Sequence, residues 1–239
     1  MFKIMSKLSG NPTVAAQPLF TSYANPQHEL GEGIYSNDGR KFRYAKAGAS
    51  ALVAGTLLQC AAEATGNENL AVAAAAVGDT TLTTTTTVTV TANQYAGGFV
   101  KVTVTPGVGL AYKIKSHPAA TSAVVTLTLE DPILVALTTS SRIDLIPSLY
   151  NGVIINPATA TGVPVGVAVY PIAATEYGWI QVEGPANVLA DGTVTVGTAL
   201  VASNGVAGAV EPAAGVQAGI GIAITGIATT EYGAVKLGL

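Results

Sequence analysis

The chain has 239 residues and a mass of 23.9 kDa, and only 10% of its residues are charged, whereas about 25% is usual for a soluble domain. The net charge is −3, hydrophobic residues make up 49% and aromatic residues 6%. This composition excludes a disordered tail, which needs high charge and low hydrophobicity. It also argues against a nucleic-acid binder, which carries a basic excess. The single cysteine, Cys60, excludes a disulfide scaffold and fits a reducing compartment.

So little charge has two common explanations, insertion into a membrane or burial against neighbouring subunits. The best uncharged candidate for a spanning helix, 212–230, is rich in Gly and Thr and alternates Ile at 220, 222 and 224, which is the period of a strand. Four Phe, nine Tyr and one Trp are too few for the aromatic girdles of a membrane barrel. We therefore expect no membrane insertion and favour burial against other subunits. The N-terminus lacks the apolar core of a secretory signal, so we expect synthesis in the cytoplasm.

Residues 1–28 contain Pro12, Pro18 and Pro26 without helical periodicity, which predicts an extended N-terminal arm. The arm packs either on its own domain or on a neighbouring chain. A β-hairpin follows, with strands at 33–35 and 41–45 around the turn sequence Asn-Asp-Gly.

The middle of the chain predicts a β-rich region over 29–150, in which 61–145 is a candidate inserted subdomain. The Ala-rich stretch 60–78 predicts either a short helix or an irregular loop, and 133–137 either a helical turn or a kinked strand. Runs of β-branched residues separated by turn residues predict four strands, at 80–91, 98–105, 109–115 and 123–129.

The C-terminal region, 151–239, contains an internal repeat. Residues 166–184 and 221–239 match at eight of nineteen positions, with an offset of 55 and a shared Thr-Glu-Tyr-Gly. Each copy predicts a hairpin, and two copies are too few for a solenoid. Short strands at this spacing predict an all-β fold, a small barrel or sandwich built from hairpins, with little helix.

The charge distribution is lopsided. Residues 1–46 hold six basic and three acidic side chains, whereas 143–239 hold six acidic residues and Lys236 alone on the basic side. Opposite charge at the two ends of a chain suits contact between copies or docking on a charged assembly, although it is equally compatible with a harmless surface asymmetry.

No pattern in the sequence predicts catalysis or a cofactor. The two histidines, His28 and His117, are far apart, and no paired Cys or Cys/His cluster predicts a zinc site. Adjacent Glu130 and Asp131 would point to opposite faces of a strand. A hydrolase would have to use His117 or Asp131, with no nucleophile nearby. We therefore expect a protein that is not an enzyme and holds no metal.

Three aromatic residues in and beside the repeat, Tyr177, Trp179 and Tyr232, concentrate ring area in a chain with little of it. Tyr and Trp are favoured at the centres of interfaces. The alternative is that these three rings fill the core under the hairpins.

Several turn and strand signatures, in this order along the chain, resemble tailed-bacteriophage capsid decoration (cement) proteins. They cover 30–55, 91–98, 114–120 and 176–192. The resemblance implies a β-rich virion protein that binds the outside of a phage head and staples the major capsid protein, often as a homotrimer. From the composition and the missing motifs we expect no cofactor and no nucleic-acid partner. The first 29 residues do not contribute to the resemblance.

We predict that basic side chains pair with capsid carboxylates and that aromatic rings act as anchors. The candidate contact residues are Lys3, Lys7, Arg40, Arg43, Tyr177, Trp179 and Tyr232. The alternative from another class is a phage fibre or adhesin module, in which a detachable C-terminal fragment recognises a host surface.

Overall fold

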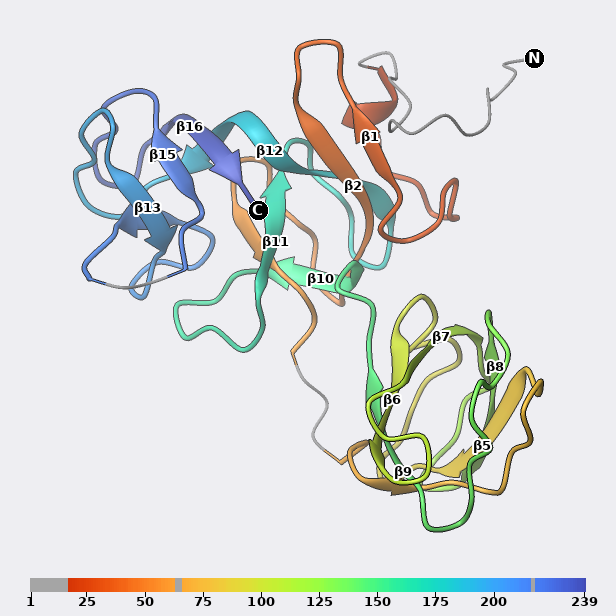
Figure 1. Ribbon diagram of the computed structural model, residues 1–239. Coiled ribbons are helices and arrows are strands. Elements are labelled where there is room, and N and C mark those ends of the chain that lie inside the picture. Colours follow the sequence, from red (N-terminus) through yellow and green to blue (C-terminus); the bar gives the residue numbers. More distant parts are fainter. Residues whose placement is uncertain (1–16, 63–65, 216–217) are drawn as a thin grey trace. The chain divides into compact units, whose positions relative to one another are not determined.

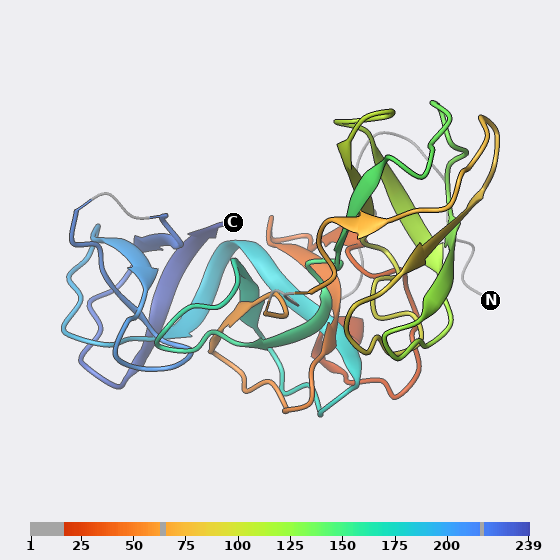
Figure 2. The same ribbon diagram turned by 90° about the horizontal axis from the view of Figure 1, so that it is seen from below.

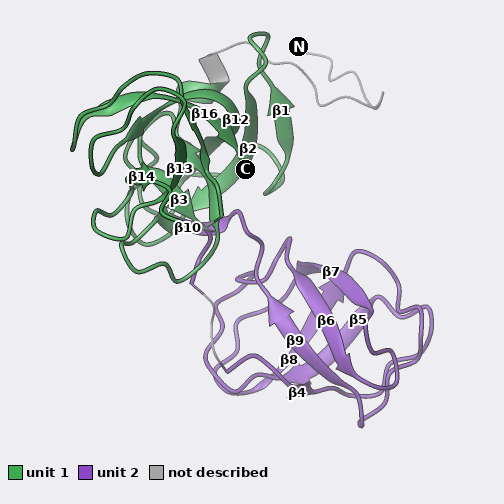
Figure 3. Ribbon diagram, turned by 60° about the vertical axis from the view of Figure 1, so that its left-hand side comes forward, with its two compact units in different colours: residues 1–59, 154–239 green, residues 60–153 purple. Residues whose placement is uncertain are grey.

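The computed structural model describes residues 17–62, 66–215 and 218–239, and these residues are almost entirely β-structure. The one helical element in them is the 3₁₀ turn η1, Gln17–Phe20. The predicted all-β class is thus confirmed. The chain divides into two compact units, unit 1 (1–59 and 154–239) and unit 2 (60–153), so unit 2 is an insertion within unit 1 (Figure 3). Unit 2 extends beyond the candidate insertion 61–145 at both ends.

Unit 2 is a closed antiparallel barrel with the strand order β4-β9-β6-β7-β8-β5. A bridge between Val72 and Thr84 joins the two end strands and closes the ring. Its alternating apolar residues fill one core. The strands are β4 Leu70–Ala71, β5 Thr81–Thr85, β6 Phe99–Val104, β7 Ala111–Ser116, β8 Val124–Leu129 and β9 Arg142–Ile146.

The predicted strands 98–105, 109–115 and 123–129 are confirmed within two residues at each end. The single long strand expected over 80–91 is wrong, because pairing of β5 with β8 ends at Thr85 and the chain then bends before Val90 bridges to Ala120. A run of Thr favours extended backbone but does not fix how long a neighbour continues to pair with it. The described part of 60–78 contains no helix, and 133–137 is a loop in which Leu137 bridges to Ala75.

Unit 1 is a ten-stranded sheet that closes on itself twice (Figure 1). Its strands are β1 Gly33–Tyr35, β2 Lys41–Ala47, β3 Leu57–Gln59, β10 Asn151–Ile155, β11 Pro164–Ala168, β12 Tyr177–Leu189, β13 Ala199–Ala202, β14 Val210–Pro212, β15 Gly221–Ala223 and β16 Tyr232–Gly238. The predicted hairpin β1–β2 is confirmed, with Gly39 at a φ of 84° in its turn.

The first ring of unit 1, which we call barrel A, consists of β2, β10, β3, β11 and the first half of β12. The second, barrel B, consists of the second half of β12 with β16, β15, β13 and β14, and a bridge from Ala190 to Val210 closes it. Strand β12 is 13 residues long and serves both barrels. It is the long cyan strand of Figures 1 and 2. Because β2 pairs with β12, the expected division at residue 150 into two consecutive regions does not describe the fold.

Barrels A and B are two copies of one structure, and the predicted repeat hairpins, β11–β12 and β15–β16, are only part of it. Ile172 bridges to Leu52 in barrel A, and its repeat partner Ile227 bridges to Val194 in barrel B. Thr175 and Thr230, at the same repeat position, have φ values of 64° and 66°. Shared unusual backbone of this kind indicates equivalent turns.

The conserved glycine of the repeat shows the same equivalence at the level of packing. A Cβ on Gly178 would lie 2.7 Å from Ile172 Cδ1, and a Cβ on Gly233 would lie 2.4 Å from Ile227 Cγ1. Neither distance is compatible with van der Waals contact, so both copies need glycine there for the same reason. Close packing therefore explains the glycine of the shared Thr-Glu-Tyr-Gly sequence.

Unit 2 is inserted at a definable point of this duplication. In barrel B, β13 and β14 are joined by the turn 203–209, which Ser203 braces by accepting from the backbone N–H groups of Gly205 and Val206. In barrel A the corresponding strands are β3 and β10, and the whole of unit 2 lies between them in sequence.

Candidate interaction surfaces

The predicted basic contact residues fall into three groups. Lys3 and Lys7 lie outside the described residues. Arg43 is half-buried, and its guanidinium donates to the carbonyl oxygen of Gly31 at 2.9 Å, so it holds the approach to the β1–β2 hairpin. Arg40 lies in the turn before β2, where its Nε donates to Asp38 Oδ2 at 2.7 Å. Arg40 also lines a groove on unit 1.

The pair formed by Arg40 and Asp38 is a local feature of the hairpin turn. Slight desolvation raises the pKa of Asp38, but hydrogen bonds from the Arg40 backbone and guanidinium and from Ser36 outweigh it and hold that pKa below its ordinary value of 3.8. The carboxylate is therefore charged at neutral pH and partly neutralises Arg40.

The three predicted aromatic anchors have different positions. Trp179 is only 2% exposed and packs edge-on against Tyr44 with ring centroids 5.0 Å apart. The core interpretation holds for Trp179, and a buried ring is not available as a surface anchor. Tyr177 is half-buried and stacks on Tyr44 at 6.1 Å, whereas Tyr232 is 48% exposed and lies against Gly55.

The arm expected over 1–28 packs on its own unit where it is described. Leu19 is fully buried in one cluster with Ile34, Phe42, Tyr44 and Trp179. Tyr23 exchanges two backbone hydrogen bonds with Tyr177, of 2.9 and 2.8 Å. The segment 17–36 therefore forms an outer layer over β2 and the first half of β12.

The opposite charges seen in the sequence do not form two separate ends of the fold. The basic strand β2 and the acidic C-terminal third belong to the same unit. In the sheet, Lys41 of β2 is the register partner of Glu183 of β12. Opposite charges on these neighbouring strands therefore partly compensate each other.

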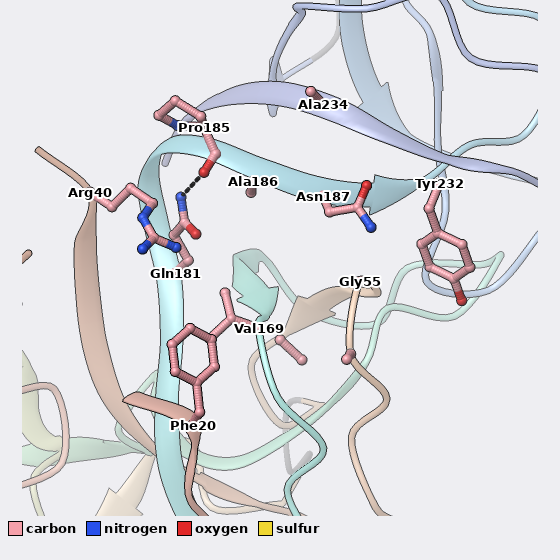
Figure 4. Close-up of a pocket in the computed structure, with 12 residues that line it drawn as sticks. Phe20, Arg40, Gly55, Val169, Gln181, Pro185, Ala186, Asn187, Tyr232 and Ala234 are labelled. Carbon is pink, nitrogen blue, oxygen red and sulfur yellow. Dashed lines mark hydrogen bonds between the residues drawn. The ribbon is translucent and has the colours of Figure 1, made fainter. Parts of the chain in front are cut away.

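A groove of about 470 Å³ opens on unit 1 beside the bend of β12 (Figure 4). We call it the β12 groove. Its walls come from both barrels and from the outer layer. The lining residues are Phe20, Arg40, Ala54, Gly55, Ala168, Val169, Gln181, Pro185, Ala186, Asn187, Tyr232 and Ala234. Phe20 and Tyr232, which are 41% and 48% exposed, supply the large apolar surfaces at its two sides.

Gln181 is the fully buried polar residue of the β12 groove. Its Nε2 donates to the carbonyl oxygens of Pro185 at 2.8 Å and Glu183 at 3.1 Å, which bridges the bend of β12. Its Oε1 is buried and has no hydrogen-bond partner among the described residues. A buried acceptor of this kind costs free energy unless a donor reaches it. Figure 4 shows the Gln181 amide between Arg40 and the apolar residues Val169 and Ala186.

Unit 2 presents a different surface, formed by the loops 72–80, 105–110 and 130–141. In an antiparallel barrel with this strand order, these three loops lie at one end, opposite the end where the chain enters and leaves. The loops are braced to one another: Gly78 N–H donates to Ile133 O at 2.9 Å, and Ser141 Oγ donates to Pro106 O at 2.9 Å.

Apolar side chains project from these loops, and we call them the apolar tips of unit 2. They are Val77, Val108, Leu134 and Val135, with exposed fractions of 64%, 59%, 64% and 42%. Grouped exposed apolar residues on a braced surface mark an interaction site more strongly than isolated ones.

His117, one of the two residues that a hydrolase would have to use, is a structural residue of unit 2. It is 4% exposed, its Nε2 accepts from the backbone N–H of Tyr95 at 3.0 Å, and its Nδ1 lies 2.8 Å from Pro118 O. Both ring nitrogens are thus engaged with backbone groups. Among the described residues, no three His, Cys, Asp or Glu side chains converge as a metal site.

No helix within the described ranges is long and apolar enough to span a bilayer. Comparisons with protein-family models, with curated proteins and with solved structures found no match for this chain.

Of the predicted site residues, Arg40 and Tyr232 are brought to one place, at opposite parts of the β12 groove. Sequence reasoning missed Phe20, Gln181 and the apolar tips. A Gln in a strand and single valines in turns carry no distinctive pattern. The one available signal was the position of Val77, Val108 and Leu134 beside turn residues, where apolar side chains are unusual.

Proposed function

We propose that this protein is a structural component of a virion, a decoration protein that binds the outer surface of a phage head and stabilises contacts between major capsid subunits. The observation that carries the proposal is the group of apolar tips on unit 2, held by braced loops at one end of the barrel. Exposed apolar surface of this kind gains free energy when a partner covers it, at about 25 cal/mol per Å².

Two further features support the proposal. A chain with 10% charged residues has little charged surface to keep solvated, which suits a protein covered by neighbours. The order of turn and strand signatures along the chain resembles that of decoration proteins. A protein that binds the assembled shell and not its free subunits stabilises the shell by mass action. A homotrimer would let one particle contact several capsid subunits at once.

The adhesin alternative fits the division of the chain less well. It expects a detachable C-terminal fragment, but β2 and β3 pair with β12 and β11, so 151–239 lacks two strands of barrel A. The all-β fold is compatible with both classes of protein, and no other observation on the described residues favours the adhesin.

The test uses the purified full chain and heads of the encoding phage that lack it. We expect saturable co-sedimentation with the heads and an increase in the temperature at which they break. The double variant Val77→Asp/Leu134→Asp should weaken binding at least about tenfold, because each charge would be buried without a partner. Val196→Asp is the matched control, since Val196 is 69% exposed on unit 1 and should bind as the parent chain does.

Light scattering on the free protein at two concentrations and two salt levels completes the test. A mass three times the 23.9 kDa chain is expected for a preassembled trimer. A parent chain that ignores heads and binds host cells would contradict the proposal and favour the adhesin. Binding that the double variant and Val196→Asp weaken equally would remove the role of the apolar tips.

A further inference from the structure

The β12 groove is the surface of barrel B that corresponds to the covered aromatic surface of barrel A. Register alignment of the two copies places Pro185 at the position of Phe42, Asn187 at that of Tyr44, and Ala234 at that of Trp179. In barrel A these positions are large, buried and covered by Leu19 and Ile34 of the outer layer. In barrel B they are small or polar, and together with Tyr232 they line open space.

The missing cover includes a strand. In barrel A, β1 pairs with β2 over Lys41–Arg43, on the edge of β2 that β12 does not occupy. The equivalent residues of barrel B are 184–186, which pair with β16 on one edge. In place of a strand, the other edge meets the side chain of Gln181, whose Nε2 donates to Glu183 O and Pro185 O. A single side-chain amide thus substitutes for a neighbouring strand at this edge.

Part of this edge still offers backbone groups to the groove. Leu189 N–H donates to Gly55 O at 2.8 Å, so Leu189 directs its backbone groups away from β16. Residues two apart in a regular strand direct them to the same edge, and pairing with β16 shows no register shift from Glu183 to Leu189. Asn187 therefore turns its N–H and C=O toward the groove that its side chain lines.

We propose that the β12 groove binds an extended polypeptide segment of a partner protein, and that this segment carries an acidic side chain. A backbone N–H of the segment satisfies the buried Gln181 Oε1, and its backbone groups pair with those of Asn187, in the manner of strand addition to a free edge. Its apolar side chains pack on Phe20 and Tyr232.

The preference for an acidic segment comes from Arg40. A guanidinium has five N–H donors, and Asp38 takes the Nε–H. A carboxylate of the bound segment would pair with the remaining N–H groups of the Arg40 guanidinium from the groove side. Asp38 competes with that carboxylate for the guanidinium. Residues 1–16 of a second copy are the alternative occupant, but their sequence contains Lys3 and Lys7 and no acidic residue, so their charge opposes Arg40. The inference goes beyond the proposed function, because the groove lies on unit 1 and the apolar tips on unit 2.

The experiment titrates the full ¹⁵N-labelled chain with three degenerate pools of acetylated, amidated nonapeptides. All pools share random Val, Ile and Thr positions, and the central residue is Asp or Glu, Asn or Gln, or Lys or Arg. The reporters are the Gln181 side-chain amide and the Asn187 backbone amide. The acidic pool should shift both, with half-saturation about fivefold below that of the neutral pool, the effect of one charge-assisted contact at a partly exposed site.

Three variants locate the effect. Arg40→Gln should abolish the preference for the acidic over the neutral pool, and Asp38→Asn should strengthen it by removing the competing carboxylate. Lys41→Gln is the matched control, because Lys41 is the next residue along the chain, and its Nζ lies over the Tyr35 ring, 5.7 Å from the centroid.

Each contrary result overturns the proposal. Absence of shifts at both reporters with all three pools would show that the groove does not take a peptide. Equal response to acidic and basic pools would remove the role of Arg40. Stronger shifts with a synthetic peptide of residues 1–16 would assign the groove to a second copy of this chain. None of these results would affect head binding through the apolar tips, which is measured separately with Val77→Asp/Leu134→Asp.

Discussion

Barrels A and B are built from equivalent strands, but they differ in what is added to them. Barrel A has an aromatic outer face covered by residues 17–36, and it accommodates unit 2 between β3 and β10. Barrel B has neither addition. Its core belongs to a purely aliphatic cluster that includes Val188, Leu200 and Val235 and extends to Leu57 and Val167 of barrel A. One ring of strands is thus stable with two very different outer faces.

The difference shows where such a fold can accept new structure. The turn between β13 and β14 in barrel B and the insertion point of unit 2 in barrel A are equivalent positions. Likewise, no described residue forms over Ala234 in barrel B the layer that covers Trp179 in barrel A, and the β12 groove occupies that place. Additions at a turn or on an outer face leave the pairing of the ring intact, so they do not oppose its folding.

The largest expected effect is the loss of the aromatic face of barrel A. Trp179→Ala removes a ring that is 2% exposed and should lower the free energy of unfolding by about 3–5 kcal/mol, from lost transfer free energy and the cavity left behind. Tyr232→Ala, in the equivalent strand of barrel B, removes an exposed ring and should cost less than about 1 kcal/mol. Urea unfolding followed by circular dichroism measures both. Equal losses of unfolding free energy in the two variants would mean that the outer faces of barrels A and B contribute equally to stability.

The second prediction uses Tyr44, whose equivalent in barrel B, Asn187, does not titrate. Burial raises the pKa of Tyr44 above its ordinary value of 10.0, against the hydrogen bond from Gln27 N–H. The folded state therefore holds this proton more tightly than the unfolded state does. The stability that this provides is complete below about pH 10 and is lost as the pH rises through the higher folded value.

Tyr44→Phe should reduce that alkaline loss of stability. At neutral pH it should cost about 1–3 kcal/mol, because Gln27 N–H loses its acceptor. Emission of Trp179, the only Trp of the chain, reports unit 1 during urea unfolding between pH 7 and 11. Tyr95→Phe is the control, since Tyr95 is a buried tyrosine of unit 2 with a raised pKa. If both variants flattened the Trp179 profile equally, Tyr44 would not be the responsible group.

The sequence predicted those elements that local turn chemistry determines. Asn-Asp-Gly marks the β1–β2 hairpin, and the repeated Thr-Glu-Tyr-Gly marks β11–β12 and β15–β16. It did not predict that β2 pairs with β12, more than 130 residues later, because long-range pairing leaves no local pattern. The full duplication was missed for a related reason: 53–58 and 195–200 share only Gly, Thr and Leu, although they are equivalent turns and strands.

The candidate site residues were likewise predictable only where the sequence carries a local signal. Arg40 and Tyr232 stood out by charge and by aromatic scarcity, and both line the β12 groove. Trp179 stood out for the same reason but is buried, because residue type alone does not give the face of a strand when an outer layer covers it. Gln181 stands out only in the structure, where its buried Oε1 has no hydrogen-bond partner among the described residues.

The last prediction expects a small effect and tests the comparison most directly, by making barrel A resemble barrel B. Replacement of 61–152 by a copy of the turn 203–209 keeps Val153 of β10 and joins β3 to β10 as β13 is joined to β14. Because unit 2 has its own closed ring and core, unit 1 should fold without it. Its unfolding free energy, followed by Trp179 emission, should change by no more than about 1–2 kcal/mol, the scale of loop-length effects. A shortened chain that lost its Trp179 transition would show that barrel A, unlike barrel B, depends on its insertion.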